Sequence, residues 1–146
     1  MNIAFFMRPK QETTYISQDF TVRQALEKMH NSRFTAVPVL DKDGRYVGTI
    51  SEGDLLWFIV RGEGGEPHTM AIESLEDFKI TDMYPFNTNN PPCLISSTIE
   101  DLILRALETN FVPIVDDRDM YIGIVTRRAI IKHFYDKSIA PLPETN

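Results

Sequence analysis

The chain contains two copies of one sequence pattern, and this internal repeat constrains its fold more than any other feature. Residues Val37–Val60 align with Val112–Tyr135 at a constant offset of 75 positions. Identities are few, but hydrophobic, hydroxyl and turn residues keep their spacing, as in VPVLDKDGRYVGTIS over VPIVDDRDMYIGIVT. Upstream, Thr21–Met29 matches Thr98–Leu107, with two residues fewer before the Val-Pro segment of the second copy. The pattern predicts two units that fold alike.

Each copy predicts the element order β-α-β-β-α. A short extended stretch leads to a threonine suited to capping a helix, Thr21 or Thr98, and apolar residues then recur at spacings of three and four. A buried Val-Pro strand, a polar turn, a second strand and a second helix complete each copy. In the first copy, the three strands are expected at Thr13–Ile16, Ala36–Leu40 and Arg45–Ile50, and the second helix at Asp54–Val60. In the second copy, the three strands are expected at Pro92–Ile95, Val112–Val115 and Tyr121–Val125, and the second helix at Ala129–Tyr135.

The predicted fold class is α+β, with two tandem repeats packed into one module because neither copy alone buries enough apolar surface. Gly-rich and Pro-rich stretches predict a loop at Arg61–Pro67 and a frayed tail at Ala140–Asn146, and Met70–Phe78 predicts a short helix. The expected units are repeat 1 at residues 1–60, a linker at 61–78, repeat 2 at 79–136 and a flexible tail at 137–146.

Charge and composition exclude several classes of partner. The net charge is −6, from 15 Lys and Arg against 21 Asp and Glu, which disfavours nucleic-acid binding because phosphate backbones need a basic surface. Any bound anion must be held by a local basic patch. The longest apolar run, Leu55–Val60, is far shorter than a membrane span of about 20 residues. With no secretory signal and a single cysteine, Cys93, the sequence predicts a cytoplasmic protein without disulfides.

Two motifs occur in both copies: a Val-Pro strand ending in Asp, and a Gly-hydrophobic-hydrophobic-Ser/Thr segment before a helix. They read VPVLD…GTISEGD and VPIVD…GIVTRR. In these motifs the chain resembles the CBS domain present as a tandem pair, a Bateman module, over nearly its whole length. It is also similar to small stand-alone CBS pairs of Gram-positive bacteria, several of which bind cyclic di-AMP.

The resemblance implies a non-catalytic sensor, usually dimeric, with a cleft between the repeats that accepts adenosyl compounds. Such ligands are AMP, ADP, ATP, S-adenosylmethionine and cyclic di-AMP. It also implies that each pocket is completed by the other repeat. In one pocket, Thr13, Thr14 and Phe34 would face Thr126 and Arg128, and in the other, Asn90, Pro92 and Cys93 would face Ser51 and Asp54. Arg33 matches a position that often touches phosphate, while for Phe34 plain core packing stays equally open.

The first strand-to-helix junction reads Ser51-Glu-Gly-Asp54 and allows two interpretations. In one, Ser51 and Asp54 form a capping box, each accepting a hydrogen bond from the backbone N–H of the other. In the other, which the family resemblance implies, Asp54 accepts hydrogen bonds from ribose hydroxyls and Ser51 supports the sugar or phosphate. A carboxylate suits a diol because it offers only acceptors.

The second junction reads Thr126-Arg127-Arg128-Ala129 and places two cations at a helix N-terminus. The helix dipole opposes them, at a cost of ~0.3–1 kcal/mol each if they are exposed. One interpretation is that Arg127 and Arg128 clamp phosphate, since guanidinium groups match phosphate oxygens bidentately. The alternative is that they pair with the acids of the preceding turn, which are Asp116, Asp117 and Asp119.

The remaining residues give little support to catalysis. His30, His68 and His133 have no carboxylate or cysteine at metal-ligand spacing and are expected on the surface, so no metal site is predicted. Cys93 follows two prolines without an activating motif and is expected to be a buried thiol. Neither a Gly-rich phosphate loop nor a nucleophile elbow is present, so the chain is not expected to be an enzyme.

The leading hypothesis is a homodimeric sensor without a cofactor that binds an adenine nucleotide, cyclic di-AMP first, between the repeats. Binding would change how the module engages an unidentified regulated protein. Three alternatives stay open: a module for AMP, ADP or ATP, an interaction scaffold with an empty cleft, and a hydrolase or transferase acting on nucleotides.

Overall fold

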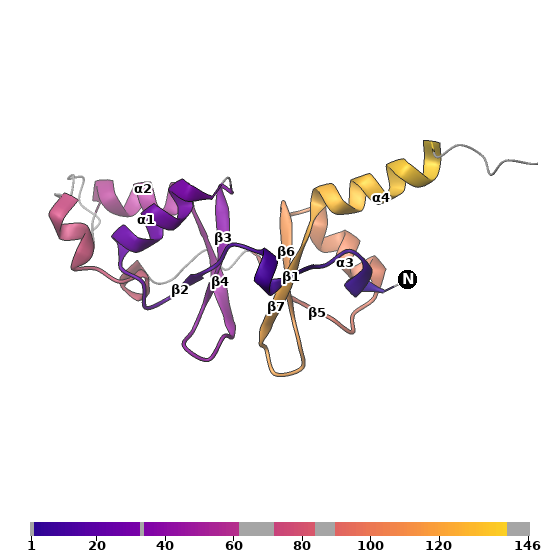
Figure 1. Cartoon of the computed structure of the whole chain (residues 1–146), viewed down its shortest axis with the longest axis horizontal. Coiled ribbons are helices and arrows are strands. Elements are labelled where there is room, and N and C mark those ends of the chain that lie inside the picture. Colours follow the sequence, from indigo (N-terminus) through magenta and orange to yellow (C-terminus); the bar gives the residue numbers. More distant parts are fainter. Residues whose placement is uncertain (1, 33, 62–71, 84–89, 140–146) are drawn as a thin grey trace, which may run out of the picture.

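In a computed structural model of the chain, residues 2–32, 34–61, 72–83 and 90–139 are described. The predicted loop after Arg61, the predicted tail at 140–146 and the candidate phosphate ligand Arg33 lie outside them. Two sheets lie side by side in the middle of the molecule, and the helices lie on their outer sides (Figure 1). Within the described residues, no helix has the length and apolar character needed to cross a membrane.

Each repeat forms one sheet with two helices, and this arrangement confirms the predicted α+β fold class. The first sheet has the strand order β2-β3-β4, and the second has the order β1-β7-β6-β5. The first repeat consists of β2 (Ile16–Ser17), α1 (Val22–Asn31), β3 (Ala36–Leu40), β4 (Tyr46–Ser51) and α2 (Glu52–Arg61). The second consists of β5 (Cys93–Leu94), α3 (Ile99–Ala106), β6 (Phe111–Val115), β7 (Tyr121–Thr126) and α4 (Arg127–Ile139).

The segments that lead into each repeat contain one more short strand and four 3-10 helices. Before β2 lie η1 (Ile3–Phe5), β1 (Arg8–Pro9) and η2 (Lys10–Glu12), and between the repeats lie η3 (Ile72–Glu76) and η4 (Ile80–Met83). The linker helix expected at Met70–Phe78 is thus a shorter 3-10 helix in its described part.

Threonine caps begin the first helix of each repeat where the sequence predicts them. Thr21 Oγ1 accepts a hydrogen bond from the Gln24 N–H at 3.1 Å, and Gln24 Oε1 accepts one from the Thr21 N–H at 2.9 Å. Thr98 Oγ1 accepts a hydrogen bond from the Asp101 N–H at 3.1 Å. These bonds satisfy N–H groups that have no partner inside the helix.

The two β-hairpins contact each other through their turns. The hairpins pair Val37 with Ile50 and Val112 with Val125, so the 75-residue offset is preserved in their registers. At the turns, the Tyr46 N–H donates to Asp119 O at 3.2 Å, and the Tyr121 N–H donates to Gly44 O at 3.0 Å. These two bonds are related by the repeat. The two sheets therefore meet in a nearly two-fold arrangement.

Each repeat has its core completed by the segment that precedes the other repeat. Ile3, before the first repeat, is fully buried in the core of the second repeat beside Val112 and Val125. Ile80, before the second repeat, is fully buried in the core of the first beside Val37. Ile3 and Ile80 occupy equivalent positions in the repeat alignment, so the exchange is reciprocal.

The N-terminal strand β1 adds an edge to the sheet of the second repeat. It runs antiparallel to β7, with Arg8 opposite Ile124 and Pro9 opposite Gly123. A Cβ atom on Gly123 would lie 2.3 Å from Arg8 O and 2.9 Å from Met7 Cγ. Only glycine at this position allows the N-terminal backbone to approach so closely.

His133 is packed among aromatic rings, which corrects the expectation that it lies on the surface. Its ring is 5.2 Å from that of Phe5, 5.1 Å from that of Phe6 and 5.5 Å from that of Phe134, measured between centroids. Its Nε2 atom is buried without a hydrogen-bond partner among the described residues. Because α4 supplies this ring, the N-terminal segment is held against the helix as well as the sheet.

We predict that Gly123→Ala destabilises the protein by about 1–3 kcal/mol, because the new methyl group forces β1 away from β7. Gly53→Ala is the matched control, since a Cβ there meets only Ser51 Oγ at 3.6 Å within a helix. The control is expected to raise stability by about 0.5–1 kcal/mol. Urea unfolding followed by circular dichroism measures both, and equal effects of the two substitutions would contradict the close approach.

Candidate functional site

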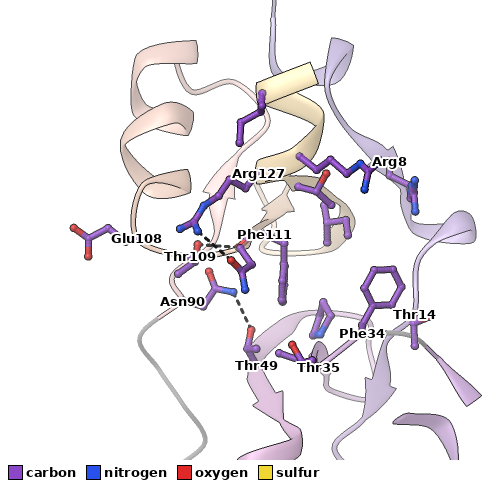
Figure 2. Close-up of a pocket in the computed structure, with 17 residues that line it drawn as sticks. Arg8, Thr14, Phe34, Thr35, Thr49, Asn90, Glu108, Thr109, Phe111 and Arg127 are labelled. Carbon is purple, nitrogen blue, oxygen red and sulfur yellow. Dashed lines mark hydrogen bonds between the residues drawn. The ribbon is translucent and has the colours of Figure 1, made fainter. Parts of the chain in front are cut away.

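A cavity of about 1180 Å³ lies between the two repeats (Figure 2). Both sheets and the beginning of α4 contribute to its walls. We call it the inter-repeat cleft. It is lined by Arg8, Thr14, Phe34, Thr35, Ala36, Pro38, Thr49, Asn90, Glu108, Thr109, Asn110, Phe111, Ile124, Thr126, Arg127, Arg128 and Ile131.

The cleft is bordered by the points where a strand passes into a helix. The first helical N–H of α2, on Glu52, donates to Thr35 O at 2.9 Å, and the first of α4, on Arg127, donates to Asn110 O at 2.8 Å. Each bond fastens a helix N-terminus to the residue that enters the neighbouring strand. Thr126 Oγ1 then caps α4 by accepting from the Ala129 N–H at 3.1 Å. These bonds fix the positions from which the side chains of the cleft project.

Each of the three nitrogens of the Arg127 guanidinium donates a hydrogen bond at or just after the end of helix α3. Its Nε donates to Ala106 O at 2.8 Å, one Nη to Leu107 O at 3.2 Å and the other to Asn110 Oδ1 at 3.1 Å. Carbonyls at a helix C-terminus have no partner within the helix and carry partial negative charge, so a guanidinium stabilises them. In this structure Arg127 connects α3 to α4.

Arg128 and Arg8 lie at the cleft with their side chains exposed, and neither has a hydrogen bond or ion pair with any described residue. Arg128 comes from the first turn of α4 and Arg8 from β1. The charged side chains of the lining are three arginines and Glu108, a formal charge of +2 in a chain of −6. Glu108 lies at the opposite end of the cleft from Arg8 (Figure 2). The lining of the cleft is therefore positively charged although the chain as a whole is negative.

The other end of the cleft is organised by a hydrogen-bonded chain of polar groups. The Tyr46 hydroxyl donates to Asn90 O at 2.7 Å, so it accepts from the Thr49 hydroxyl, which lies 2.7 Å away. Asn90 Nδ2 in turn donates to Thr49 Oγ1 at 3.3 Å. Burial raises the pKa of Tyr46 to about 12, so its hydroxyl keeps its proton at neutral pH. Asn90 and Thr49 are thus held in fixed orientations.

A similar chain of hydrogen bonds joins the N-terminal segment to the second repeat. The Thr13 hydroxyl donates to Lys10 O at 2.8 Å, and its oxygen lies 2.9 Å from the Tyr121 hydroxyl, which must therefore donate to it. Burial raises the pKa of Tyr121 to about 12 as well. Thr13 does not line the inter-repeat cleft, whereas its neighbour Thr14 does.

The residues of the first junction form the capping box that the sequence allows. Asp54 Oδ2 accepts from the Ser51 N–H at 2.8 Å, and Ser51 Oγ accepts from the Asp54 N–H at 3.1 Å. Neither side chain lines the cleft. Nor do Pro92, which is half-buried, and Cys93, which is buried as expected on β5.

Of the twelve candidate site residues, the structure brings together six around one cavity: Thr14, Phe34, Asn90, Thr126, Arg127 and Arg128. Sequence reasoning missed Arg8 and Phe111, the latter being the repeat counterpart of Ala36. Arg8 lies on a two-residue strand whose partner is more than 110 residues away, so no local pattern indicates its position. Extending the repeat upstream to Ile3 and Ile80 is the signal that could have found the exchanged segment.

In the described parts of the chain, no group of three or more His, Cys, Asp or Glu side chains is placed to hold a metal ion. The donor groups around the cleft are guanidinium, hydroxyl and amide groups, together with two phenylalanine rings. Such a lining can bind an organic anion, with hydrogen bonds to its charged part and apolar contacts to the rest.

The CBS domain family model matches the chain twice, over residues 6–61 and 82–136. The CBS domain-containing protein CBSX1, chloroplastic, of Arabidopsis thaliana is 28% identical over 144 residues, with 87% of this chain and 61% of that protein covered. An inosine-5'-monophosphate dehydrogenase of Methanocaldococcus jannaschii is 28% identical over 120 residues, covering 80% of this chain and 21% of the enzyme. The chain thus spans about three fifths of the first relative and one fifth of the second.

Solved structures show the same fold. The crystal structure of CbpB in complex with c-di-AMP has a TM-score of 0.82 at 21% identity, covering 93% of this chain and 85% of that one. The Listeria monocytogenes CbpB protein in complex with c-di-AMP has a TM-score of 0.78 at 24% identity, covering 93% and 96%. A CBS domain protein from Streptococcus pneumoniae has a TM-score of 0.80 at 20% identity, covering 93% and 88%. The arrangement of the two repeats is therefore shared.

We predict that the two adjacent arginines differ in their effect on stability. Arg127→Ala is expected to lower the free energy of unfolding by about 1–3 kcal/mol, because two α3 carbonyls and the Asn110 amide oxygen lose a charged donor. Arg128→Ala, the matched control one residue away, is expected to change it by less than about 0.5 kcal/mol. Urea unfolding without nucleotide tests this, and an equal loss from both substitutions would contradict the assignment.

Proposed function

The chain belongs to the CBS domain family, and we propose that it is a cytoplasmic, non-catalytic sensor that binds an adenine nucleotide, cyclic di-AMP first, in the inter-repeat cleft. The observation that carries this proposal is that two guanidinium groups, those of Arg8 and Arg128, line that cleft without a partner among the described residues. Guanidinium groups bind phosphate through paired hydrogen bonds, so these two side chains are suited to a phosphate-bearing ligand.

The size and the apolar part of the cleft favour a dinucleotide. Small-molecule pockets have volumes of about 300–1,000 Å³, and this cleft, at about 1180 Å³, exceeds that range. Phe34 and Phe111 line it and offer ring faces on which an adenine can stack. The exposed hydroxyl of Thr35 is available to the sugar or the base.

Two of the structural neighbours are CbpB proteins in complex with c-di-AMP, and their fold matches over more than nine tenths of this chain. This likeness supports cyclic di-AMP over a mononucleotide as the first ligand. A ribose contact from Asp54 forms no part of the proposal, because its carboxylate accepts the Ser51 N–H within the capping box and lies outside the cleft. The nucleotide acts as a regulatory ligand and no further cofactor is proposed.

The sensor relays ligand binding to a regulated protein whose identity the sequence does not specify. A ligand changes such an interaction only if it binds one conformation of the module better than another. The cleft is lined by both repeats, so a nucleotide that fills it stabilises one relative position of the two sheets. The regulated protein then binds the module with its sheets in that position more strongly or more weakly than it binds the ligand-free module.

We further propose that the sensor is a homodimer that pairs through helices α2 and α4. Both helices carry large exposed apolar side chains, and the helices lie on one side of the molecule (Figure 1). Leu56 and Val60 on α2 correspond, at the 75-residue offset, to Ile131 and Tyr135 on α4. A face with this internal two-fold relation suits pairing with a second copy about a two-fold axis.

We predict that Arg128→Ala and Arg8→Ala each weaken cyclic di-AMP binding by about tenfold or more, because each removes charged hydrogen bonds to phosphate. Arg118→Ala is the matched control, since this exposed arginine lies on a turn outside the cleft. The affinity of the Arg118→Ala variant for cyclic di-AMP is expected to stay within about twofold of that of the unchanged protein. Isothermal titration calorimetry measures all three.

Two results would contradict the proposal. If cyclic di-AMP does not bind while AMP or ATP does, the module senses a mononucleotide. If no adenine nucleotide binds, the cleft belongs to an interaction scaffold. Conversion of the nucleotide during the titration, detected by chromatography, would show that the protein is an enzyme.

For the homodimer, we predict that Leu56→Asp combined with Tyr135→Asp gives a monomer, since burying a carboxylate in an apolar interface is unfavourable. Leu107→Asp is the control, because Leu107 is equally exposed but lies at the end of α3. Sedimentation velocity is expected to show a dimer for the control and for the unchanged chain. A monomeric unchanged chain at tens of micromolar would rule out this interface.

A further inference from the structure

A second cavity lies against the first repeat, at the turn of the β3–β4 hairpin, and has a volume of about 640 Å³. We call it the lysine pocket. No residue lines both this pocket and the inter-repeat cleft. Thr13 lines the pocket, and its neighbour Thr14 lines the cleft. It is lined by Lys10, Gln11, Thr13, Tyr15, Ser17, Phe20, Lys28, Leu40, Asp41, Lys42, Asp43 and Gly44.

Three of the chain's six lysines, Lys10, Lys28 and Lys42, line this pocket. None of them forms an ion pair with a described residue. The lysines come from three different segments, namely η2, α1 and the hairpin turn. In a chain with a net charge of −6, three unpaired ammonium groups around one cavity form a local positive region.

The two carboxylates of the lining are engaged elsewhere. Asp41 Oδ1 accepts hydrogen bonds from the N–H groups of Asp43 and Arg45, each at 2.9 Å. Asp43 Oδ2 lies 3.2 Å from an Nη of Arg45 and forms an ion pair with it. These contacts orient the two carboxylates within the hairpin turn but leave them charged. With three ammonium groups and two carboxylates, the lining carries a formal charge of +1.

The pocket also has an aromatic wall. Tyr15 and Phe20 are both half-buried, and the Lys10 ammonium group lies 5.3 Å from the centre of the Tyr15 ring. Ser17 Oγ accepts the Asp19 N–H at 3.1 Å, which leaves its hydroxyl hydrogen free to donate. Ammonium and hydroxyl donors thus lie beside apolar ring faces.

The second repeat differs from the first at several of these positions. In the second repeat, which folds in the same way, the equivalent positions hold Pro92 in place of Tyr15 and Ser97 in place of Phe20. The position of Lys42 is taken there by Asp117, which reverses the charge. Tyr15 and Phe20 also pack against core clusters of the molecule, and Lys28 has a cationic counterpart in Arg105. The reversal of charge at Lys42 is therefore the clearest difference between this pocket and the second repeat.

We propose that the lysine pocket is a second ligand site, which binds a small organic phosphate whose phosphate group contacts the lysines and whose ring packs on Tyr15 and Phe20. Ammonium groups bind phosphate as mobile point charges. The half-buried rings provide the apolar contact that distinguishes such a ligand from inorganic phosphate. The site is independent of the inter-repeat cleft and of the nucleotide proposed there.

Phenyl phosphate is the probe, titrated at low ionic strength and followed by proton–nitrogen NMR of the full chain. We expect saturable shifts at the amides of residues 10–20 and 40–44. The double substitution of Lys28→Gln and Lys42→Gln is expected to weaken binding by about tenfold or more. Lys79→Gln, an exposed lysine outside the pocket, is the control and is expected to change affinity by less than about twofold.

Inorganic phosphate serves as the second probe and is expected to bind more weakly than phenyl phosphate. The proposal is overturned if the shifts occur only around Arg8 and Arg128, if the control loses as much affinity as the double variant, or if both probes bind equally well. The proton–nitrogen spectrum of each variant reports whether the fold is retained. Because Lys28 and Lys42 are exposed, both are expected to be replaced without unfolding.

Discussion

The structure depends on the reciprocal burial of two leading segments, because neither repeat has a complete core without the other. Ile3 fills the core of the second repeat, and Ile80 fills that of the first. Fully burying one such side chain contributes about 1.5–3 kcal/mol, so the exchange resists separation of the repeats. The paired hydrogen bonds between the hairpin turns hold the same arrangement at the other contact. The reciprocal burial thus joins the two repeats into one module.

This exchange also creates the inter-repeat cleft. The N-terminal segment must cross from the second repeat to the first, and on the way it adds β1 to the edge of β7. Arg8 is thereby carried to the same cavity as Arg128, which follows β7 in the chain. The close approach over Gly123 makes this possible. The cleft thus receives two arginines that have no partner in the described part of the chain and lie 120 positions apart in the sequence.

Local chemistry made much of the fold predictable from the sequence. The strand Ala36–Leu40 and the caps at Thr21, Thr98, Ser51 and Thr126 follow from patterns of a few residues, and the structure confirms them. The exchange of leading segments was not predicted, since β1 has two residues and its partner is distant in sequence.

The candidate site was predicted only in part, for a related reason. The two arginines of the second junction are adjacent and chemically identical, so their roles cannot be separated by sequence. The position of the end of α3 distinguishes the two arginines. The last carbonyls of α3 accept hydrogen bonds from Arg127, whereas Arg128 lies at the cleft without such partners among the described residues. Pairing with the acids of the preceding turn does not occur, as Asp116 accepts the N–H groups of its own turn instead.

A crystal structure of the protein with cyclic di-AMP tests the central claim most directly. The account predicts the nucleotide between the repeats, with phosphate oxygens within hydrogen-bonding distance of Arg8 and Arg128 while Arg127 still binds the end of α3. A nucleotide bound elsewhere, or one whose phosphates avoid both arginines, would contradict it.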